Sequence, residues 1–132
     1  MHKAYKVKLE DATTLARNIA RELKGGEILG LVGPLGAGKT TFTKSLAQAL
    51  KVKTRVTSPT FTLLHKFAGR LGKQKIFLYH LDLYRTKNYR EIKTLGLEEF
   101  WGRPKTITAI EWADKIKRHW PKKTILIEFS HD

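Results

Sequence analysis

The stretch that decides the fold covers residues 28–40 and reads ILGLVGPLGAGKT. Residues 28–32 form a continuous apolar run, as a strand buried on both faces of a sheet requires. Residues 33–40 match the phosphate-binding pattern G-x-x-x-x-G-K-[ST]. Apolar side chains then recur at helical spacing at Phe42, Leu46, Ala49 and Leu50. A buried strand, a glycine-rich loop and a helix in this order predict a phosphate-binding loop.

The residue types in this loop suit a nucleoside triphosphate. Glycines at 33, 36 and 38 permit backbone angles that a Cβ would forbid, and they leave room for phosphate oxygens near the main chain. The loop N–H groups then form an anion-binding nest at the positive end of the following helix. The Lys39 ammonium can contact the β- and γ-phosphates, and the Thr40 hydroxyl is a ligand for Mg²⁺.

Hydrolysis or phosphoryl transfer also needs a carboxylate near the metal, and two apolar runs end in one. Residues 76–81 are followed by Asp82, and residues 107–110 by Glu111. Either carboxylate could hold Mg²⁺ while the other polarises the attacking water. The alternative is that both are solvated acids at strand ends. The catalytic candidates are therefore Lys39, Asp82 and Glu111.

The segment Thr57-Ser58-Pro59-Thr60 offers hydroxyls that could reach the γ-phosphate or its metal, as a nucleotide-sensing loop does, or it is a plain Ser-Pro turn. Adenine is favoured by exclusion. Residues 86–89 lack the final Asp of the guanine-reading pattern Asn/Thr-Lys-x-Asp, and no Asp-x-x-Gly switch follows Asp82. We therefore expect ATP and Mg²⁺ as ligands. The residues predicted to bind the nucleotide are Gly33, Leu35, Gly36, Ala37, Gly38, Lys39, Thr40, Thr41 and Thr60.

Short apolar runs alternate with helical patterns along the whole chain, which is typical of an α/β protein. Besides 28–32, strands are expected at 5–9, 61–67, 75–81, 106–110 and 124–129, the first of them a half-exposed edge strand. A turn around Gly69 and Gly72 would join 61–67 to 75–81 as a hairpin. Helices are expected after Asp11, a candidate N-cap, and at 88–95 and 113–119.

The 132 residues indicate one domain, residues 1–132. The lack of Cys excludes disulfides and thiol nucleophiles, and no apolar run approaches the roughly 20 residues that cross a bilayer. We therefore expect neither secretion nor a membrane span. A net charge of +14 favours anionic partners, unless the lysines only solvate a small protein. Basic clusters at 51–55, 73–75, 115–118 and 122–123 are spread along the sequence.

Five segments in this order resemble the bacterial TsaE (YjeE) family. They are residues 33–42, 58–63 (SPTFTL), 79–85 (YHLDLYR), 95–99 (LGLEE) and 110–112 (IEW). The phosphate loop is common to many families, whereas the SPT and HxDLYR segments in this order are much more specific. The resemblance implies a small P-loop NTPase with a mixed, mainly parallel sheet flanked by helices.

The resemblance also implies a function and a set of roles. Family members hydrolyse ATP weakly alone and support the TsaD–TsaB pair, in which TsaD transfers threonylcarbamoyl to tRNA. In this picture the metal ligands are Thr40 and Glu111, Asp82 is needed for turnover, and residues 57–60 act as a switch. We accordingly expect a cytoplasmic protein, monomeric when isolated, that meets tRNA only indirectly through the complex. Similar proteins usually continue beyond residue 132 into a strand with a basic residue near the nucleotide, a contact not expected here.

Two other functions remain open at this point. A small-molecule kinase shares the phosphate loop, although 132 residues leave little room for an acceptor pocket and lid. A basic RNA-binding module could use the nucleotide site only to lock its conformation. Arg85 and Arg103 are candidates for an arginine finger within the chain. His80, inside an apolar run, is expected to be a packed, hydrogen-bonded residue rather than a metal ligand. Trp112 directly follows the candidate metal acid and could shape the site, but packing in the core is the default expectation.

Overall fold

The structure is a computed structural model that describes residues 3–34, 36–53, 64–84, 89–94, 96–121 and 123–131. Strands and helices follow one another along the described chain, with a pair of consecutive strands and a pair of consecutive helices in its middle. Their bounds are β1 (Ala4–Lys8), η1 (Leu9–Asp11), α1 (Ala12–Glu22), β2 (Ile28–Val32), α2 (Lys39–Ala49), β3 (Leu64–Leu71), β4 (Gln74–Asp82), α3 (Tyr89–Lys93), α4 (Leu97–Phe100), β5 (Thr106–Glu111), η2 (Ala113–His119) and β6 (Ile125–Ser130). The elements η1 and η2 are 3₁₀ helices.

Within the described ranges, the strands form a 6-stranded sheet in the order β1-β6-β2-β5-β4-β3. Neighbouring strands are parallel except for the antiparallel hairpin of β3 and β4. The mixed, mainly parallel sheet predicted from the sequence is therefore confirmed, and β1 is an edge strand as expected.

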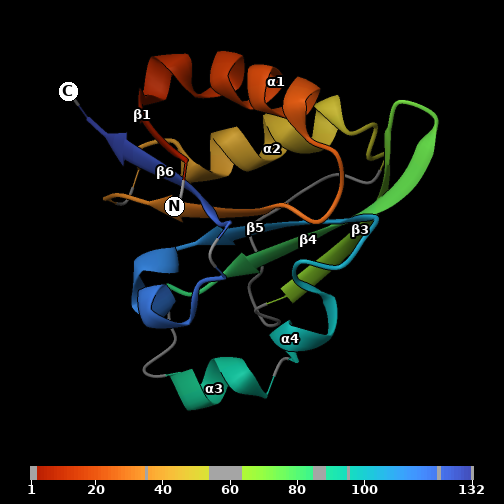
Figure 1. Ribbon diagram of the computed structural model, residues 1–132. Helices are drawn as coiled ribbons and strands as arrows, with labels where there is room; N and C mark the ends of the chain where they lie inside the picture. The colour runs from red at the N-terminus through yellow and green to blue at the C-terminus, as the bar shows by residue number, and fades with distance from the viewer. Residues whose placement is uncertain are drawn as a thin grey trace.

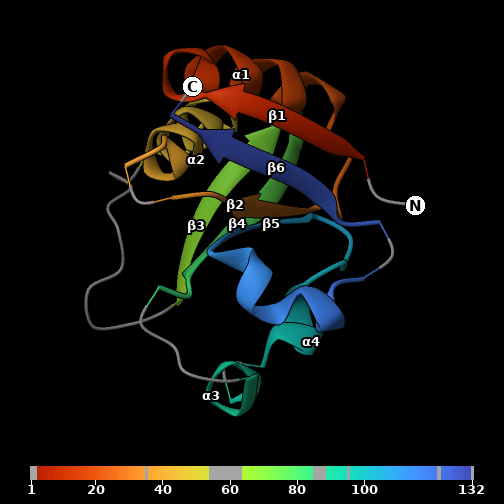
Figure 2. The same cartoon turned by 90° about the vertical axis from the view of Figure 1, so that its left-hand side faces the viewer.

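Helices cover both faces of this sheet (Figures 1 and 2). The face under α1 and α2 holds the larger core, with Leu29, Leu31, Phe42 and Leu46 fully buried. The opposite face packs against α4 and η2 in a second core. Because central strands are buried on both faces, β2 has no exposed side chain to break its apolar run.

The sheet brings three chain segments to one edge. Strands β2, β4 and β5 are mutually parallel, so their carboxyl ends lie together. At that edge β2 leads through residues 33–38 into α2, while β4 and β5 end at Asp82 and Glu111. Asp82 and Glu111 are direct register partners across the two strands. The edge therefore sets both acids beside the glycine-rich loop.

The expected hairpin is confirmed, with one correction at Gly69. This glycine lies inside β3, and the chain turns at Gly72 instead. A Cβ at Gly69 would lie 2.6 Å from the Leu50 carbonyl oxygen, and Arg70 N–H donates to the same oxygen at 2.5 Å. Gly69 thus allows the end of α2 to approach the edge strand. Residues 61–63 of the predicted strand lie outside the described residues.

The start of α1 differs from expectation. Asp11 occupies the N-cap of α1, but its side chain makes no capping hydrogen bond. Its backbone is already helical because η1 leads directly into α1, whereas a side-chain cap needs extended backbone.

The helix expected at 113–119 is present with these bounds, and it is a kinked 3₁₀ helix with the break at Ile116 (φ −124°, ψ 26°). The Trp120 indole N–H occupies the Ala113 carbonyl at 2.9 Å, an acceptor that a continuous helix would use itself. The helix expected at 88–95 is α3, and the short α4 was not predicted.

Candidate functional site

The glycine-rich loop adopts the backbone angles predicted for it. Gly33, Gly36 and Gly38 have φ values of 144°, 78° and 113°, a region that L-residues with side chains rarely enter. A Cβ at Gly33 would lie 2.6 Å from the Phe129 carbonyl oxygen, so this glycine also permits close packing against β6. Among the described residues beyond its chain neighbours, none has a heavy atom within 4 Å of the position that a Cβ of Gly36 would take.

Lys39 begins α2 and points back over the loop. Its side chain is 5% exposed, and Nζ donates to the carbonyl oxygens of Gly33 and, at 2.9 Å, Pro34. The same ammonium lies 3.8 Å from the centre of a Trp112 ring, a cation–π distance. Burial lowers the pKa of Lys39, and the negative charge of Glu111 is the strongest effect opposing that shift. The charge thus sits in a partly dry site, where a phosphate would interact strongly with it.

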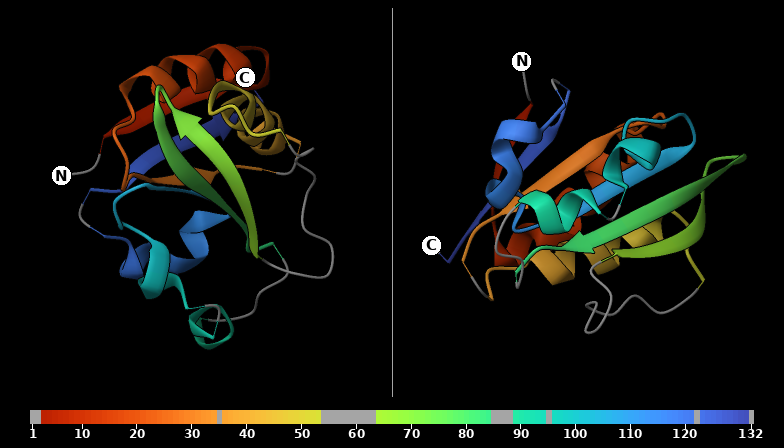
Figure 3. Two further views of the ribbon diagram at one scale, coloured as in Figure 1. Left: turned by 90° about the vertical axis from the view of Figure 1, so that its right-hand side faces the viewer. Right: turned by 90° about the horizontal axis from the view of Figure 1, so that it is seen from below.

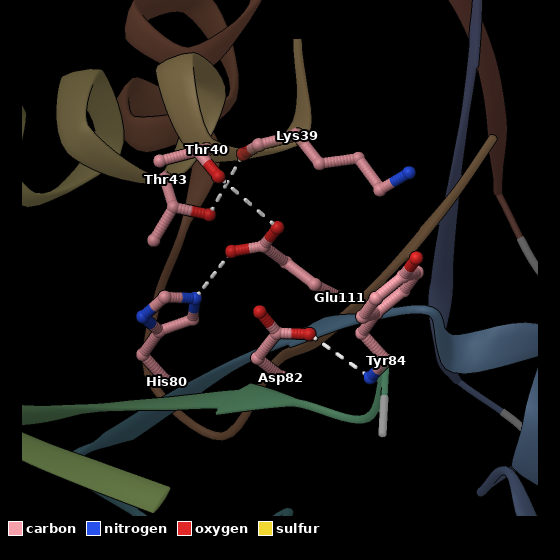
Figure 4. Close-up of polar contacts among 7 residues, drawn as sticks. All are labelled: Lys39, Thr40, Thr43, His80, Asp82, Tyr84 and Glu111. Carbon is pink, nitrogen blue, oxygen red and sulfur yellow. Dashed lines mark hydrogen bonds and ion pairs between the residues drawn. The ribbon is translucent and has the colours of Figure 1, made fainter. Parts of the chain in front are cut away.

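Glu111 is a buried carboxylate whose two oxygens have different partners (Figure 4). The Thr40 hydroxyl donates to Oε1 at 3.3 Å, and Oε2 lies 2.6 Å from His80 Nε2. An ionised carboxylate only accepts hydrogen bonds, so Nε2 carries the proton when Glu111 is ionised. His80 is fully buried, as predicted for a packed, hydrogen-bonded residue. Its partner was not predicted, because the two residues are 31 positions apart.

Asp82 lies beside Glu111 on the neighbouring strand. Burial raises the pKa of the Asp82 carboxyl, and the charge of Glu111 adds to the rise. The opposing influence comes first from the Tyr84 backbone N–H, which donates to Oδ1 at 3.0 Å. A carboxylate whose pKa is moved towards neutrality is a better proton acceptor than an ordinary aspartate.

A pocket of about 380 Å³ unites these groups. Two aromatic residues in its wall, Tyr84 and Trp112, have ring centres 5.1 Å apart. Trp112 directly follows Glu111 and has a left-handed backbone (φ 60°). It packs against the second core as expected, and its ring also lies against the Lys39 ammonium. The lining residues are Leu9, Gly36, Gly38, Lys39, Thr40, Thr41, Asp82, Tyr84, Glu111 and Trp112.

Not every predicted binding residue lines this pocket. Gly33 packs against Phe129 of β6, and Ala37 is 1% exposed, so each could contribute only backbone groups. Leu35 and Thr60 lie outside the described residues, as does Arg85. Arg103 precedes β5 and therefore lies at the opposite edge of the sheet from the pocket, too far to act as an arginine finger within the chain.

Comparisons with known proteins agree on one family. Residues 7–132 match the family model described as "Threonylcarbamoyl adenosine biosynthesis protein TsaE". The chain belongs to the TsaE family. The TsaE protein of Aquifex aeolicus is 46% identical over 82% of this chain and 74% of its own length. The TsaE protein of Bacillus subtilis is 36% identical over 89% of this chain and 70% of its own length.

A solved TsaE-like structure has the same fold. The crystal structure of Bacillus subtilis YdiB superposes with a TM-score of 0.68 at 30% identity, covering 96% of this chain and 75% of that one. The family places this chain in the biosynthesis of threonylcarbamoyladenosine on tRNA. No helix in the described residues is both long and apolar enough to cross a membrane.

Proposed function

We propose that this TsaE protein binds ATP with Mg²⁺ in the pocket at the start of α2 and hydrolyses the ATP slowly, in support of a TsaD–TsaB complex. The observation that carries the proposal is the convergence of Lys39, Thr40, Asp82 and Glu111 in one pocket. These residues come from three segments of the chain, and a phosphate loop facing two carboxylates is the arrangement that phosphoryl transfer needs.

Lys39 is proposed to neutralise the β- and γ-phosphates. Its ammonium already has two carbonyl acceptors in the loop, Gly33 and Pro34. A triphosphate would have to draw Lys39 away from these acceptors and from the Trp112 ring, so part of the binding free energy would be spent on this exchange. Binding should therefore change the environment of Trp112.

Thr40 and Glu111 are proposed to hold Mg²⁺. A hydroxyl and a carboxylate are the oxygen donors that this hard cation prefers. Adjacent ligands of an octahedral Mg²⁺ lie about 3 Å apart, given metal–oxygen distances near 2.1 Å. The Thr40 and Glu111 oxygens are 3.3 Å apart, so the donor pair fits such an ion. Bound Mg²⁺ would neutralise charge that develops on the transferred phosphoryl group.

The remaining roles belong to two residues of β4, the strand beside Glu111. His80 is proposed to position Glu111 by holding Oε2, which leaves Oε1 turned towards Thr40. Asp82 is proposed to orient and polarise the attacking water, since it lines the pocket and its pKa is raised by burial. Arg103 lies at the opposite end of β5 from the pocket, so it cannot supply the cation that stabilises the transition state. A partner could supply that cation, which would account for the slow turnover expected of the protein by itself.

The proposal is tested by ATP turnover with Mg²⁺, alone and after addition of TsaD and TsaB. We expect slow release of inorganic phosphate alone and an increase of roughly tenfold or more with the partners, because a cation supplied to the transition state can accelerate phosphoryl transfer by up to about 10³- to 10⁵-fold. The Lys39→Ala variant added to the same partners controls for ATP hydrolysis by TsaD. Unchanged turnover together with separate elution in gel filtration would contradict the proposal.

The role of His80 predicts a difference between two variants. His80→Leu removes the donor to Glu111 and should reduce turnover and Mg²⁺ affinity by about 10- to 100-fold, as loss of a partner behind a metal ligand does. His80→Gln keeps an N–H donor and should retain much more of both. The Mg²⁺ concentration that half-saturates nucleotide binding measures this effect separately from turnover. Equal Mg²⁺ dependence in both variants would show that His80 only packs the core.

A further inference from the structure

Two basic clusters that are separate in the sequence meet beside the β3–β4 hairpin. Lys51 and Lys53 follow α2, and Arg70 and Lys75 are register partners on the hairpin. The hydrogen bond from Arg70 N–H to the Leu50 carbonyl oxygen joins these two regions. Together with Ala68, Gly69 and Phe77, the four cationic residues line a groove of about 370 Å³, here called the hairpin groove.

The charge of the hairpin groove is not neutralised within the described chain. All four cations are exposed, and none has an ion-pair partner among the described residues. The sequence itself contains no acidic residue between Glu27 and Asp82. The groove is therefore a concave, positively charged surface that would attract a polyanion.

The groove also contains an exposed aromatic ring. Phe77 is 43% exposed, whereas its neighbours on β4, Ile76 and Leu78, point to the other face of the sheet and are buried. Lys66 places its ammonium 4.2 Å from the ring centre. An exposed aromatic ring among cations is a surface on which a nucleobase can stack.

The hairpin groove is separate from the nucleotide pocket. Lys75 is near the start of β4 and Asp82 is its last residue, so about 23 Å of strand separates them at roughly 3.3 Å per residue. Figure 3 shows the hairpin extending along one side of the molecule, away from the loop that precedes α2. A ligand in the groove and a nucleotide at Lys39 would therefore not compete for the same residues.

We propose that the hairpin groove binds RNA. Lys51, Lys53, Arg70 and Lys75 contact backbone phosphates, and Phe77 stacks on a base. Carboxylates of an acidic protein surface could pair with the four cations, but they would not stack on the exposed Phe77 ring. The family role in tRNA modification supplies an RNA partner of this chemistry. The assignment differs from the expectation that tRNA is met only through the complex.

Binding of a fluorescently labelled tRNA transcript, followed by anisotropy over a range of salt concentrations without ATP, tests the proposal. Each phosphate contact contributes a slope of about −0.7 in log K against log salt for single strands, or about fivefold in affinity at 0.1 M. The Arg70→Gln/Lys75→Gln double variant should therefore bind roughly 25-fold more weakly, with a slope shallower by about 1.4. Wild-type affinity and slope in this variant would overturn the proposal, as would absence of tRNA binding by the unmodified chain.

Two controls separate the groove from other causes. The Lys6→Gln/Arg17→Gln variant removes the same charge from β1 and α1, at the other edge of the sheet, and should bind tRNA within about twofold of the original. Lys39→Ala should also leave tRNA binding unchanged, because the phosphate loop is not the site. If Lys6→Gln/Arg17→Gln lost as much tRNA affinity as the groove variant, the affinity would come from net charge. An equal loss in Lys39→Ala would assign tRNA binding to the phosphate loop.

The ring distinguishes RNA from an acidic protein. Phe77→Leu keeps an apolar side chain but removes the stacking surface, so tRNA affinity should fall about fivefold or more. Binding of a poly-glutamate peptide should be weaker than that of tRNA and insensitive to this substitution. Equal binding of the peptide, or unchanged tRNA affinity in Phe77→Leu, would assign the groove to an acidic protein partner and reject the RNA assignment.

Discussion

Replacing Glu111 with glutamine is expected to lower ATP turnover by about 100-fold or more. The substitution keeps the shape of the side chain and an oxygen for the His80 Nε2–H, but it removes the negative charge that faces Thr40. A metal ion that stabilises transition-state charge contributes several kcal/mol, and about 3 kcal/mol corresponds to roughly 150-fold in rate. Steady-state phosphate release at saturating ATP and Mg²⁺ measures the loss.

A matched control for this variant is Glu128→Gln on β6. Glu128 is exposed and lies on another strand of the same sheet, so its replacement changes the net charge equally and should leave turnover unchanged. Thermal unfolding of both variants checks that the fold is kept. If Glu111→Gln turned over ATP at the original rate, Glu111 would not be the metal ligand, and Asp82 would become the candidate for that role.

Replacing Lys39 with alanine is expected to weaken ATP binding strongly. A charge-assisted hydrogen bond contributes about 1.5–3 kcal/mol, so losing even one contact to the phosphates weakens binding by roughly 10- to 150-fold. Isothermal titration calorimetry with a non-hydrolysable ATP analogue measures the affinity. Because Lys39 lies against Trp112, tryptophan fluorescence should also respond to nucleotide in the original chain and not in the variant.

Lys44→Ala is the control. Lys44 is exposed on the same helix and does not line the pocket, so its replacement removes the same charge outside the site. We expect its affinity for the analogue to stay within about twofold of the original. Comparable affinity in Lys39→Ala would mean that nucleotide, if it binds, does so elsewhere, and the proposed function would not stand on this pocket.

The local patterns of the sequence predicted most elements correctly and failed where a distant segment intervenes. Gly69 looks like a turn residue by itself, but it serves the approach of the Leu50 carbonyl. Segment 113–119 is a helix as its pattern predicts, but its 3₁₀ form and its break at Ile116 were not predicted. At Gly69 the deciding atom belongs to another part of the chain, so no local pattern could reveal it.

The candidate site divides in the same way. The phosphate loop and both strand-end acids were predicted, because each depends on residue type within a short segment. The His80 contact with Glu111 was not predicted, and a role of Trp112 in shaping the site was only the alternative to core packing. Two signals were present: a polar residue in a buried run, and an aromatic residue directly after the candidate metal ligand.

The sequence by itself determined which segments become strands and helices, and that residues 33–40 form a loop rich in backbone donors. These features depend on side-chain periodicity and glycine content over short distances. Only the tertiary structure decided that β4 pairs with β5 so that Asp82 faces Glu111, and that the end of α2 meets the hairpin. Strand order and register minimise the free energy of the whole chain, because burying both faces of the sheet constrains all segments at once.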